Sequence, residues 1–284
     1  MKSALKFVFG SVFATIFSFL TLGNSYADAL LDKVQSGGAV RLGFANEIPW
    51  AYPGDNNEPL GFVHVAALGA LKNMGIENIE PIVTDWGGLI PGLNANRYDI
   101  VTGGMYILGS RCENMNFSEP IGVFGDVFVV PAGNPKNLNN YEDIKNNPGT
   151  VMVTGVGYNI VEAAHDAGVP DSQIMQVPGP AEMLAALLAG RADAIGNNVM
   201  GGQHLVDQSG GKIELADPTA MPDKTKQGVG IGFRKSDTDF LAAFNTALAE
   251  FIGTEEHLTA AAEYNYGKHH LPDGTTTAHY CANR

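Results

Sequence analysis

The chain has 284 residues, of which 17 are Lys or Arg and 30 are Asp or Glu, so its formal net charge at pH 7 is −13. A surface of this sign repels nucleic acid and anionic lipid, and the sequence contains no basic patch, so nucleic-acid binding is excluded as a role. The length and an apolar content of 45% are sufficient for one or two domains with sizeable cores.

The first 27 residues have the three-part layout of a secretory signal peptide. Lys2 and Lys6 give a positive start, the run 7–22 is apolar, and Ser25-Tyr26-Ala27 puts small residues three and one before a cleavage point. A membrane anchor is the alternative, but the run is shorter than the ~20 residues of a spanning helix. The residue after the cleavage point is Asp28 and not a cysteine. We therefore expect a protein that is free in the periplasm and carries no lipid anchor.

The two cysteines of the chain are Cys112 and Cys281. In an oxidising periplasm such a pair can form a disulfide, which would tether the C-terminal tail to the segment after Arg111. Two separate buried thiols are the alternative, because two cysteines alone do not decide the pairing. We expect the disulfide.

Strand and helix patterns alternate along the rest of the chain, which predicts parallel sheets in an α/β architecture. A first set has expected strands at 39–44, 79–84 and 98–102 and expected helices at 63–74 and 87–95. A second set has expected strands at 150–154, 173–177 and 192–196 and expected helices at 158–167 and 180–189. A further helix ends near residue 252; any residue of Ser236-Asp237-Thr238-Asp239 could cap it, and Asp239 is its expected start.

A short motif recurs in the two sets. Asn96-Arg97-Tyr98-Asp99-Ile100 follows a helix and leads into a strand, and Gly190-Arg191-Ala192-Asp193-Ala194 does the same. We therefore expect two lobes built on one plan, with the chain crossing and returning at the β-like runs 127–131 and 229–233. The predicted boundaries are 28–130 and 231–284 for lobe 1, and 131–230 for lobe 2.

Side chains of distinctive chemistry follow the strands of the first set. They are Glu47, Trp50, Trp86, Tyr106 and Arg111. Because ligands of open α/β sheets bind outside the carboxyl ends of the strands, we expect these side chains to meet in a cleft between the lobes. A guanidinium binds a carboxylate bidentately, aromatic faces attract a soft cation, and a carboxylate pairs with that cation. The set predicts a small zwitterionic ligand; the alternatives are core tryptophans, a turn-capping Glu47 and a solvated Arg111.

In the second set, the run from Thr154 through Gly157 to Asn159 leads from a strand into a helix, where the backbone can approach a ligand closely. Its glycine spacing lacks the further elements of a dinucleotide site. Asn197 and Asn198 follow another strand and offer neutral amides to the cleft. Either asparagine could instead cap a turn.

Signals for catalysis and cofactors are missing from the sequence. The seven histidines show no metal-ligand spacing, and neither a nucleophile elbow nor a phosphate-binding loop is present. We therefore expect no catalytic residue, no metal site and no cofactor.

The same residues resemble the periplasmic solute-binding proteins of polar-amino-acid ABC importers over nearly the whole mature chain. The most specific element is Gly104-Met105 leading to Arg111-x5-Phe117-Ser118-x-Pro120, and the repeated motif supports it. The resemblance implies a two-lobed, type II (Venus-flytrap) α/β fold with two hinge strands. It also implies that Arg111 grips the ligand carboxylate, and that a monomer docks transiently on an ABC permease in the inner membrane.

One departure from the amino-acid binders narrows the expected ligand. Asn198 stands where that family usually has an aspartate for the α-amino group, and the neutral amide looks more like the ectoine/hydroxyectoine-binding branch. The segment 44–51 is similar to the first ligand loop of that branch. Glu47 would then pair with the cyclic amidinium inside a box of Trp50, Trp86 and Tyr106, although the branch more often has Phe or Tyr at the two Trp positions.

Three other readings stay open. The ligand could be a polar amino acid or a betaine. The protein could instead be a secreted enzyme similar to cyclohexadienyl dehydratases, which share the fold. It could also be a periplasmic sensor that signals through a membrane receptor.

Overall fold

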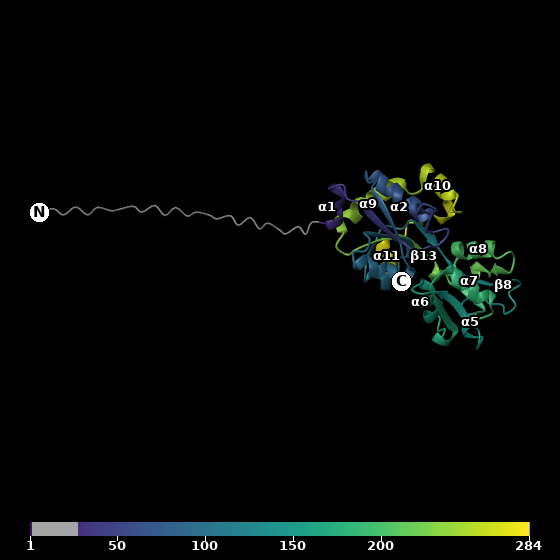
Figure 1. The fold of residues 1–284 in the computed structure, drawn as a ribbon. Coiled ribbons are helices and arrows are strands. Elements are labelled where there is room, and N and C mark those ends of the chain that lie inside the picture. Colours follow the sequence, from purple (N-terminus) through teal and green to yellow (C-terminus); the bar gives the residue numbers. More distant parts are fainter. Residues whose placement is uncertain (2–27, 284) are drawn as a thin grey trace.

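The computed structural model describes residues 28–283 and Met1; the rest of the predicted signal peptide lies outside the described residues. The described chain forms two α/β lobes side by side, each with its own sheet (Figure 1). This confirms the two-lobed α/β fold. Among the residues that the structure describes, no helix has both the length and the apolar character needed to cross a membrane.

The sheet of lobe 1 has the strand order β4-β1-β5-β13-β6, with β7 also paired to β13. Its strands are β1 (Val40–Phe44), β4 (Ile79–Val83), β5 (Ile100–Tyr106), β6 (Asn116–Phe117), β7 (Gly122–Phe124) and β13 (Gln227–Phe233). β1 runs parallel to β4 and β5, and β13 runs antiparallel to β5. A small hairpin of β2 (Tyr52–Pro53) and β3 (Pro59–Leu60) stands apart from this sheet.

Helices cover both faces of the lobe 1 sheet, because side chains from both faces are buried in separate apolar clusters. One face carries α2 (Phe62–Asn73), α9 (Thr238–Phe251) and α10 (Glu255–Ala262). The other carries α3 (Leu89–Asn94) and the C-terminal α11 (Thr277–Asn283). The remaining helical segments of lobe 1 are α1 (Ala29–Gln35), η1 (Trp86–Gly88), α4 (Gly109–Cys112) and η5 (Lys268–His270).

The sheet of lobe 2 has the order β10-β9-β11-β8-β12. Its strands are β8 (Asp126–Pro131), β9 (Met152–Gly155), β10 (Ile174–Val177), β11 (Ala194–Asn198) and β12 (Ile213–Leu215). Its helices are α5 (Tyr141–Lys145), α6 (Asn159–Asp166), η2 (Asp171–Gln173), α7 (Pro180–Leu188), α8 (Val199–Gln208), η3 (Pro218–Ala220) and η4 (Asp223–Thr225). A separate apolar cluster forms the core of this lobe.

The repeated motif has the same structural role in each lobe. Asp99 precedes β5, and its carboxylate accepts the N–H of Arg41 in the parallel neighbour β1 at 2.9 Å. Asp193 precedes β11, and its carboxylate accepts the N–H of Val151, just before the parallel neighbour β9, also at 2.9 Å. Each aspartate therefore fixes the start of one strand against the next, which sets where the carboxyl ends of both strands fall.

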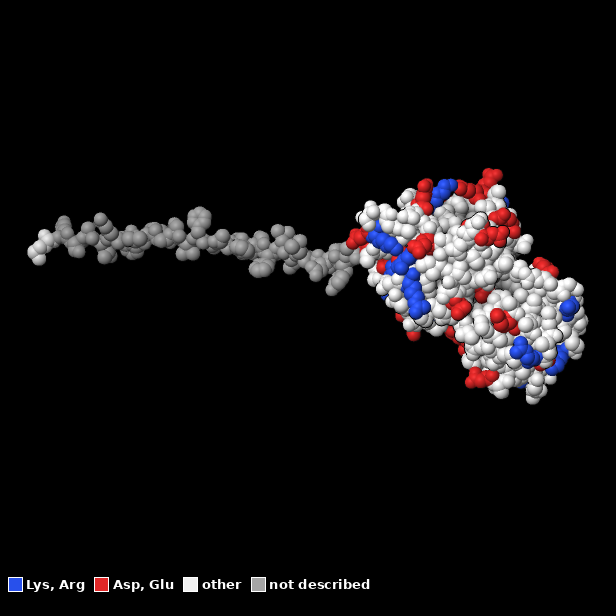
Figure 2. Space-filling view, in the orientation of Figure 1, with Lys and Arg blue, Asp and Glu red and all other residues white. Residues whose placement is uncertain are grey.

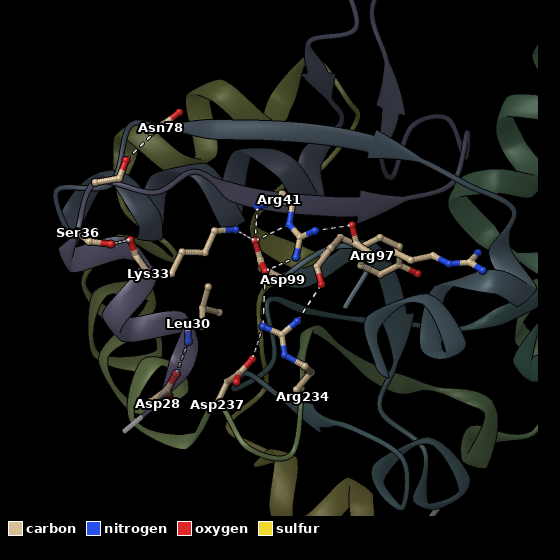
Figure 3. A network of polar contacts seen from close by, with 12 residues as sticks. Asp28, Leu30, Lys33, Ser36, Arg41, Asn78, Arg97, Asp99, Arg234 and Asp237 are labelled. Carbon is tan, nitrogen blue, oxygen red and sulfur yellow. Dashed lines mark hydrogen bonds and ion pairs between the residues drawn. The ribbon is translucent and has the colours of Figure 1, made fainter. Parts of the chain in front are cut away.

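Asp99 is the centre of an ionic network on lobe 1 (Figure 3). Its carboxylate contacts Lys33 at 2.6 Å and Arg41 at 2.8 Å, and Arg234 lies between Asp99 and Asp237. Burial alone would raise the pKa of Asp99, but the hydrogen bonds from Arg41 and Lys33 hold it at about 2. The space-filling view shows a run of Lys and Arg side chains, in blue, along one side of lobe 1, and Asp and Glu side chains, in red, on both lobes (Figure 2).

The strand pairing places the two crossing points a few residues from the predicted boundaries. β8 pairs with β11 and β12, so it belongs to lobe 2, whereas the sequence assigned residues up to 130 to lobe 1. β13 pairs with β5 from Val229 to Phe233, so its first residues belong to lobe 1 and not to lobe 2. The chain therefore crosses close to Gly125 and returns close to Lys226. Apolar runs in sequence show that a strand exists but not which sheet it joins.

The predicted start of the long helix α9 was two residues too late. Its N-cap is Asp237, and Asp239 lies in the first turn. Asp28 supplies a cap from elsewhere in the chain: its carboxylate accepts the N–H of Phe240 at 2.8 Å and also the N–H groups of Leu30 and Leu31 in α1. The sequence pattern missed this cap because the two residues lie far apart in the chain.

A disulfide joins Cys112 in α4 to Cys281 in α11. It ties the C-terminal helix to lobe 1 across a sequence separation of 169 residues. Beside it, Tyr280 packs so closely on Gly228 of β13 that a Cβ added there would lie 2.4 Å from the tyrosine ring. The C-terminal helix is thus held by both covalent and packing contacts.

Replacing both cysteines with alanine should lower the free energy of unfolding by about 2–5 kcal/mol, because closing a long loop restricts the unfolded chain. Denaturant unfolding of the double variant and the parent measures this difference. A midpoint equal to that of the parent would show that the packing of α11 alone holds the tail.

Candidate functional site

The loop after β1 brings two predicted ligand residues together. Glu47 and Ala51 form a backbone bridge, with Glu47 N–H donating to Ala51 C=O at 2.9 Å and Ala51 N–H donating back at 3.0 Å. Trp50 N–H also donates to Glu47 C=O, at 2.7 Å. This tight turn places a carboxylate and an indole at the carboxyl end of β1, where the two lobes meet.

A small cavity of about 20 Å³ lies between the lobes. Its lining comes from three segments of lobe 1 and two of lobe 2: Glu47, Trp50, Trp86, Gly104, Tyr106, Tyr158, Asn159 and Asn198. Most of the residues that the sequence nominated are thus in one place. The exceptions are Arg111, Thr154, Gly157 and Asn197.

Trp50 forms one aromatic wall of the cavity and is only 4% exposed. Its ring packs against Phe62 and Phe124 with centroid distances of 4.8 and 4.6 Å, and Tyr106 lies 6.2 Å away. Gly104 supports this arrangement, because a Cβ on Gly104 would lie 2.6 Å from the Trp50 ring. Gly104 also has φ +79°, a left-handed conformation that favours glycine.

Trp86 forms a second wall and links the lobes. Its ring packs edge-on against Tyr158 of lobe 2 at 5.2 Å, and its Nε1–H donates to the carbonyl of Gly157 at 3.2 Å. The guanidinium carbon of Arg111 lies 5.9 Å from the centre of the same ring, within the range of a cation–π contact.

Glu47 is paired with a residue of the other lobe. The hydroxyl of Tyr158 donates to Glu47 Oε1 at 2.5 Å. Burial raises the pKa of Glu47 to about 7, and the hydrogen bond from Tyr158 lowers it only in part. Glu47 is therefore a carboxyl group that changes charge near neutral pH inside the cavity.

Arg111 lies next to the cavity rather than in its wall. It is 7% exposed, and it donates from Nη1 to Tyr106 C=O at 2.9 Å and from Nη2 to Gly157 C=O at 3.0 Å. Burial lowers its pKa to about 10, which leaves it charged at neutral pH. The carbonyl of Gly157 thus accepts from two lobe 1 side chains, Arg111 and Trp86.

Asn198 meets the cavity from lobe 2. As the N-cap of α8 it accepts the N–H of Gly201 at 2.8 Å, and the same Oδ1 accepts Trp50 Nε1–H at 3.0 Å. Asn197 is 2% exposed, and its Oδ1 accepts both N–H and Nδ2–H of Asn198. Asn197 therefore orients Asn198 and lines the outer cleft instead of the cavity.

Thr154, which the sequence predicts to be a ligand-binding residue, lines neither the cavity nor the outer cleft. It lies in β9, with a strand paired on either side, and is 0% exposed. Its hydroxyl is buried and has no hydrogen-bond partner within the described chain. Gly157, by contrast, takes part through its carbonyl, and its φ of +78° turns that carbonyl into position.

Three residues of the site were not nominated from the sequence. Tyr158 pairs with Glu47, Gly104 accommodates Trp50, and Asp126 accepts a hydrogen bond from Asn159 at 2.8 Å. Tyr158 lies inside the nominated run 154–159, so its phenol was available as a signal. Asp126 had no signal, because it precedes a strand that the sequence assigned to the other lobe.

The outer cleft is wider than the inner cavity. It has a volume of about 640 Å³ and is bordered by residues after β1 and β4 in lobe 1 and by α7 and α8 in lobe 2. Glu47 and Trp86 line both spaces, so they separate the cavity from the outer cleft. Among the described residues, no group of three or more His, Cys, Asp or Glu is placed to hold a metal ion.

A model of the bacterial extracellular solute-binding proteins, family 3, matches residues 40–266. The chain belongs to this family. A relative named "Probable amino-acid ABC transporter periplasmic-binding protein y4tE", from Sinorhizobium fredii, is 34% identical over 265 residues, which cover 89% of this chain and 86% of that protein. The L-cystine-binding protein TcyJ of Escherichia coli is 27% identical over 230 residues, which cover 80% of this chain and 83% of that one.

Solved structures show the same architecture. EhuB in complex with hydroxyectoine superposes with a TM-score of 0.80 and 27% identity, covering 89% of this chain and 98% of that one. The ancestral amino acid-binding protein AncCDT-1, a precursor of cyclohexadienyl dehydratase, gives a TM-score of 0.72 at 24% identity, covering 83% and 99%. The second likeness supports the fold alone.

Replacing Gly104 with alanine should displace Trp50 and lower the free energy of unfolding by about 2–4 kcal/mol, from overpacking and backbone strain. Gly133→Ala is a matched control, since Gly133 has φ +80° and no atom within 4 Å of an added Cβ. Denaturant unfolding should show a loss of about 1 kcal/mol for the control, from strain alone. Equal losses in the two variants would contradict the close contact with Trp50.

Proposed function

We propose that the chain is the periplasmic substrate-binding component of an ABC importer and that its lobes close on a small compatible-solute zwitterion such as ectoine or hydroxyectoine. The observation that carries the proposal is the gathering of one carboxylate and four aromatic rings around a single cavity, with the Arg111 guanidinium beside it. Family membership and relatives named as ABC transporter binding proteins support the importer role. EhuB with bound hydroxyectoine supports the ligand class.

The cationic end of the ligand would lie among Trp50, Trp86 and Tyr106, facing Glu47. Each aromatic face can contribute about 0.5–2 kcal/mol to a desolvated cation. Glu47 adds a directed ion pair, which gains strength because water is excluded. The raised pKa of Glu47 fits this role, since an approaching cation favours the ionised carboxylate that burial otherwise disfavours.

The carboxylate end would bind Arg111. Two of its N–H groups hold the carbonyls of Tyr106 and Gly157, and a guanidinium carries five donors in all. The contact with Tyr106 lies within lobe 1 and orients the side chain. The contact with Gly157 joins the lobes, so it can form or break as they close and open.

Hinge motion follows from the size of the cavity. A space of about 20 Å³ is close to that of one water molecule, so a solute enters only when the lobes part. Five polar contacts of the described chain would have to open between the lobes: Glu47–Tyr158, Trp50–Asn198, Trp86–Gly157, Arg111–Gly157 and Ser110–Glu162. The ligand would replace several of these contacts when the lobes close on it. The closed, monomeric form would then dock transiently on the permease in the inner membrane.

A polar amino acid is the second candidate ligand, because relatives bear the names of amino-acid and L-cystine binders. The neutral Asn198 and the crowded aromatic walls favour a bulkier, softer cation than an α-ammonium group. A secreted enzyme on the same fold is the rival from another class. Recovery of the bound compound unchanged after long incubation would support binding, and turnover would overturn it.

Arg111→Ala should weaken zwitterion binding by about 30-fold or more, since truncating one partner of a buried charge pair costs 2–5 kcal/mol. Calorimetry with ectoine, hydroxyectoine, glycine betaine, histidine and arginine measures the loss and ranks the ligands. Arg191→Ala, an exposed arginine of lobe 2, is the control and should leave affinity unchanged. If Arg111→Ala bound the ligand within a few-fold of the parent's affinity, Arg111 would not be the residue that binds the ligand carboxylate. If the parent protein bound an amino acid more tightly than ectoine and hydroxyectoine, the assignment of ectoine as the ligand would be wrong.

Affinity for a permanently cationic ligand should rise with pH through about 7. Below this pH Glu47 is protonated and must lose its proton to pair with the cation, so lowering the pH from 8 to 6 should cost up to about tenfold in affinity. Glu47→Gln should make the profile shallower, and the slope that remains should be that of Asp126, whose pKa burial also raises to about 7. Tyr158→Phe should shift it to higher pH, because the tyrosine hydrogen bond lowers the pKa of Glu47. A flat profile in the parent would contradict the assignment of Glu47 to the cationic end.

A further inference from the structure

Asp126 is a buried carboxylate directly behind the ligand cavity. It is the first residue of β8, at the crossing between the lobes, and is 1% exposed. Asn159 Nδ2–H donates to its Oδ1 at 2.8 Å, and the Tyr141 hydroxyl donates to its Oδ2 at 2.8 Å. Each carboxylate oxygen therefore holds a donor from a different helix, α6 or α5.

This geometry fixes which end of the Asn159 amide is left for a ligand. Asn159 lines the cavity, and its NH2 group is engaged by Asp126. A carboxylate accepts hydrogen bonds but cannot donate them, so the amide cannot turn around without placing its oxygen against another acceptor. Asp126 holds one N–H of this amide and fixes its orientation, which leaves the carbonyl Oδ1 as the acceptor that Asn159 can offer to a ligand.

We propose that Asp126 is a positioning residue that presents the Asn159 carbonyl to the ligand, so that the site selects a cation bearing N–H or O–H donors over a fully alkylated one. The inference rests on the proposed zwitterion-binding function and adds to it the hydrogen-bonding character of the cationic end. The aromatic walls alone would accept either kind of cation.

The rest of the cavity wall agrees with this selection. Glu47 is a second acceptor on the lobe 1 side of the same cavity. Asp126 also pairs with Asn198 in the β8–β11 register, so one rigid strand pair supports both lobe 2 amides. A trimethylated cation has no N–H or O–H to donate, so it would leave the oxygens of Glu47 and Asn159 buried without a hydrogen bond. The free-energy cost of these unpaired acceptors would weaken its binding strongly.

Asp126→Asn tests the inference because it reverses the constraint on Asn159. The buried Tyr141 hydroxyl still needs an acceptor, so the new amide would keep its oxygen for Tyr141 and turn its NH2 toward Asn159. Asn159 would then turn over and present its own NH2 to the ligand. At pH 8.5, above the raised pKa values of about 7 for Glu47 and Asp126, affinity for ectoine should fall about tenfold. Affinity for glycine betaine, which has no N–H on its cation, should change less than twofold.

The exchange Asp126→Asn with Asn159→Asp is the rescue variant. The new amide can then donate to one carboxylate oxygen while the other remains an acceptor for the ligand, so ectoine affinity should return to within about threefold of the parent. Asp207→Asn is the matched control, an exposed carboxylate of α8 in lobe 2 that accepts a side-chain amide N–H of Gln203 at 2.7 Å. It should change neither affinity. A purely structural role for Asp126 would give equal losses for both ligands and no rescue.

A measurement without ligand separates this inference from the proposed function. In the parent, the Asn159 NH2 resonances in an amide NMR spectrum should be shifted and protected by the bond to Asp126, and Asp126→Asn should remove this protection. Resonances unchanged by the substitution would overturn the inference whatever the protein binds. A protein that binds none of the zwitterions yet shows the protected amide would instead overturn the proposed function. Tighter binding of glycine betaine than of ectoine by the parent would overturn the selectivity.

Discussion

The carbonyl of Gly157 is the acceptor on which the arrangement of the site depends. It receives hydrogen bonds from Trp86 and from the buried Arg111, two side chains of lobe 1. A buried guanidinium is costly unless it is fully hydrogen-bonded, so closure of the lobes and burial of Arg111 stabilise each other. The same requirement applies to Glu47, which is buried against the Tyr158 hydroxyl. The lobes therefore meet through polar groups that each need a partner from the other side.

The two-lobed plan explains why these groups can meet at all. Asp99 in lobe 1 and Asp193 in lobe 2 each bond to the backbone of the neighbouring parallel strand, so strand ends occur at matching positions in both sheets. The candidate ligand residues, which follow these strands in the sequence, therefore face each other between the two lobes. Within the described residues the chain crosses between the lobes near Gly125 and near Lys226, so each half of the candidate site belongs to one sheet and its helices.

Close packing determines the shape of the cavity, and burial determines the pKa values of the carboxyl groups around it. Gly104 has no side chain, which lets Trp50 lie against β5 and form a wall of the cavity. Burial raises the pKa values of Glu47 and Asp126 to about 7, so both carboxyl groups respond to small changes of their surroundings. A cation in the cavity would favour the ionised forms, which couples ligand binding to the charge state of the hinge region. Within family 3 of the solute-binding proteins, this chain combines an aromatic cavity with acceptor groups on both lobes.

The sequence by itself determined the α/β class, the two-lobe repeat and the lobe 1 half of the site. Alternating strand and helix patterns are local, and the rule that ligands border strand ends then groups Glu47, Trp50, Trp86 and Tyr106, which the structure places around one cavity. Tertiary structure alone decided which sheet β8 and β13 join. It also decided that Asp28 caps a helix more than 200 residues away in the sequence. In lobe 2 it decided that Thr154 is buried and that Asp126 accepts a hydrogen bond from Asn159. The physical reason is that hydrogen-bond partners and burial depend on contacts between distant segments, which no local pattern of residue types encodes.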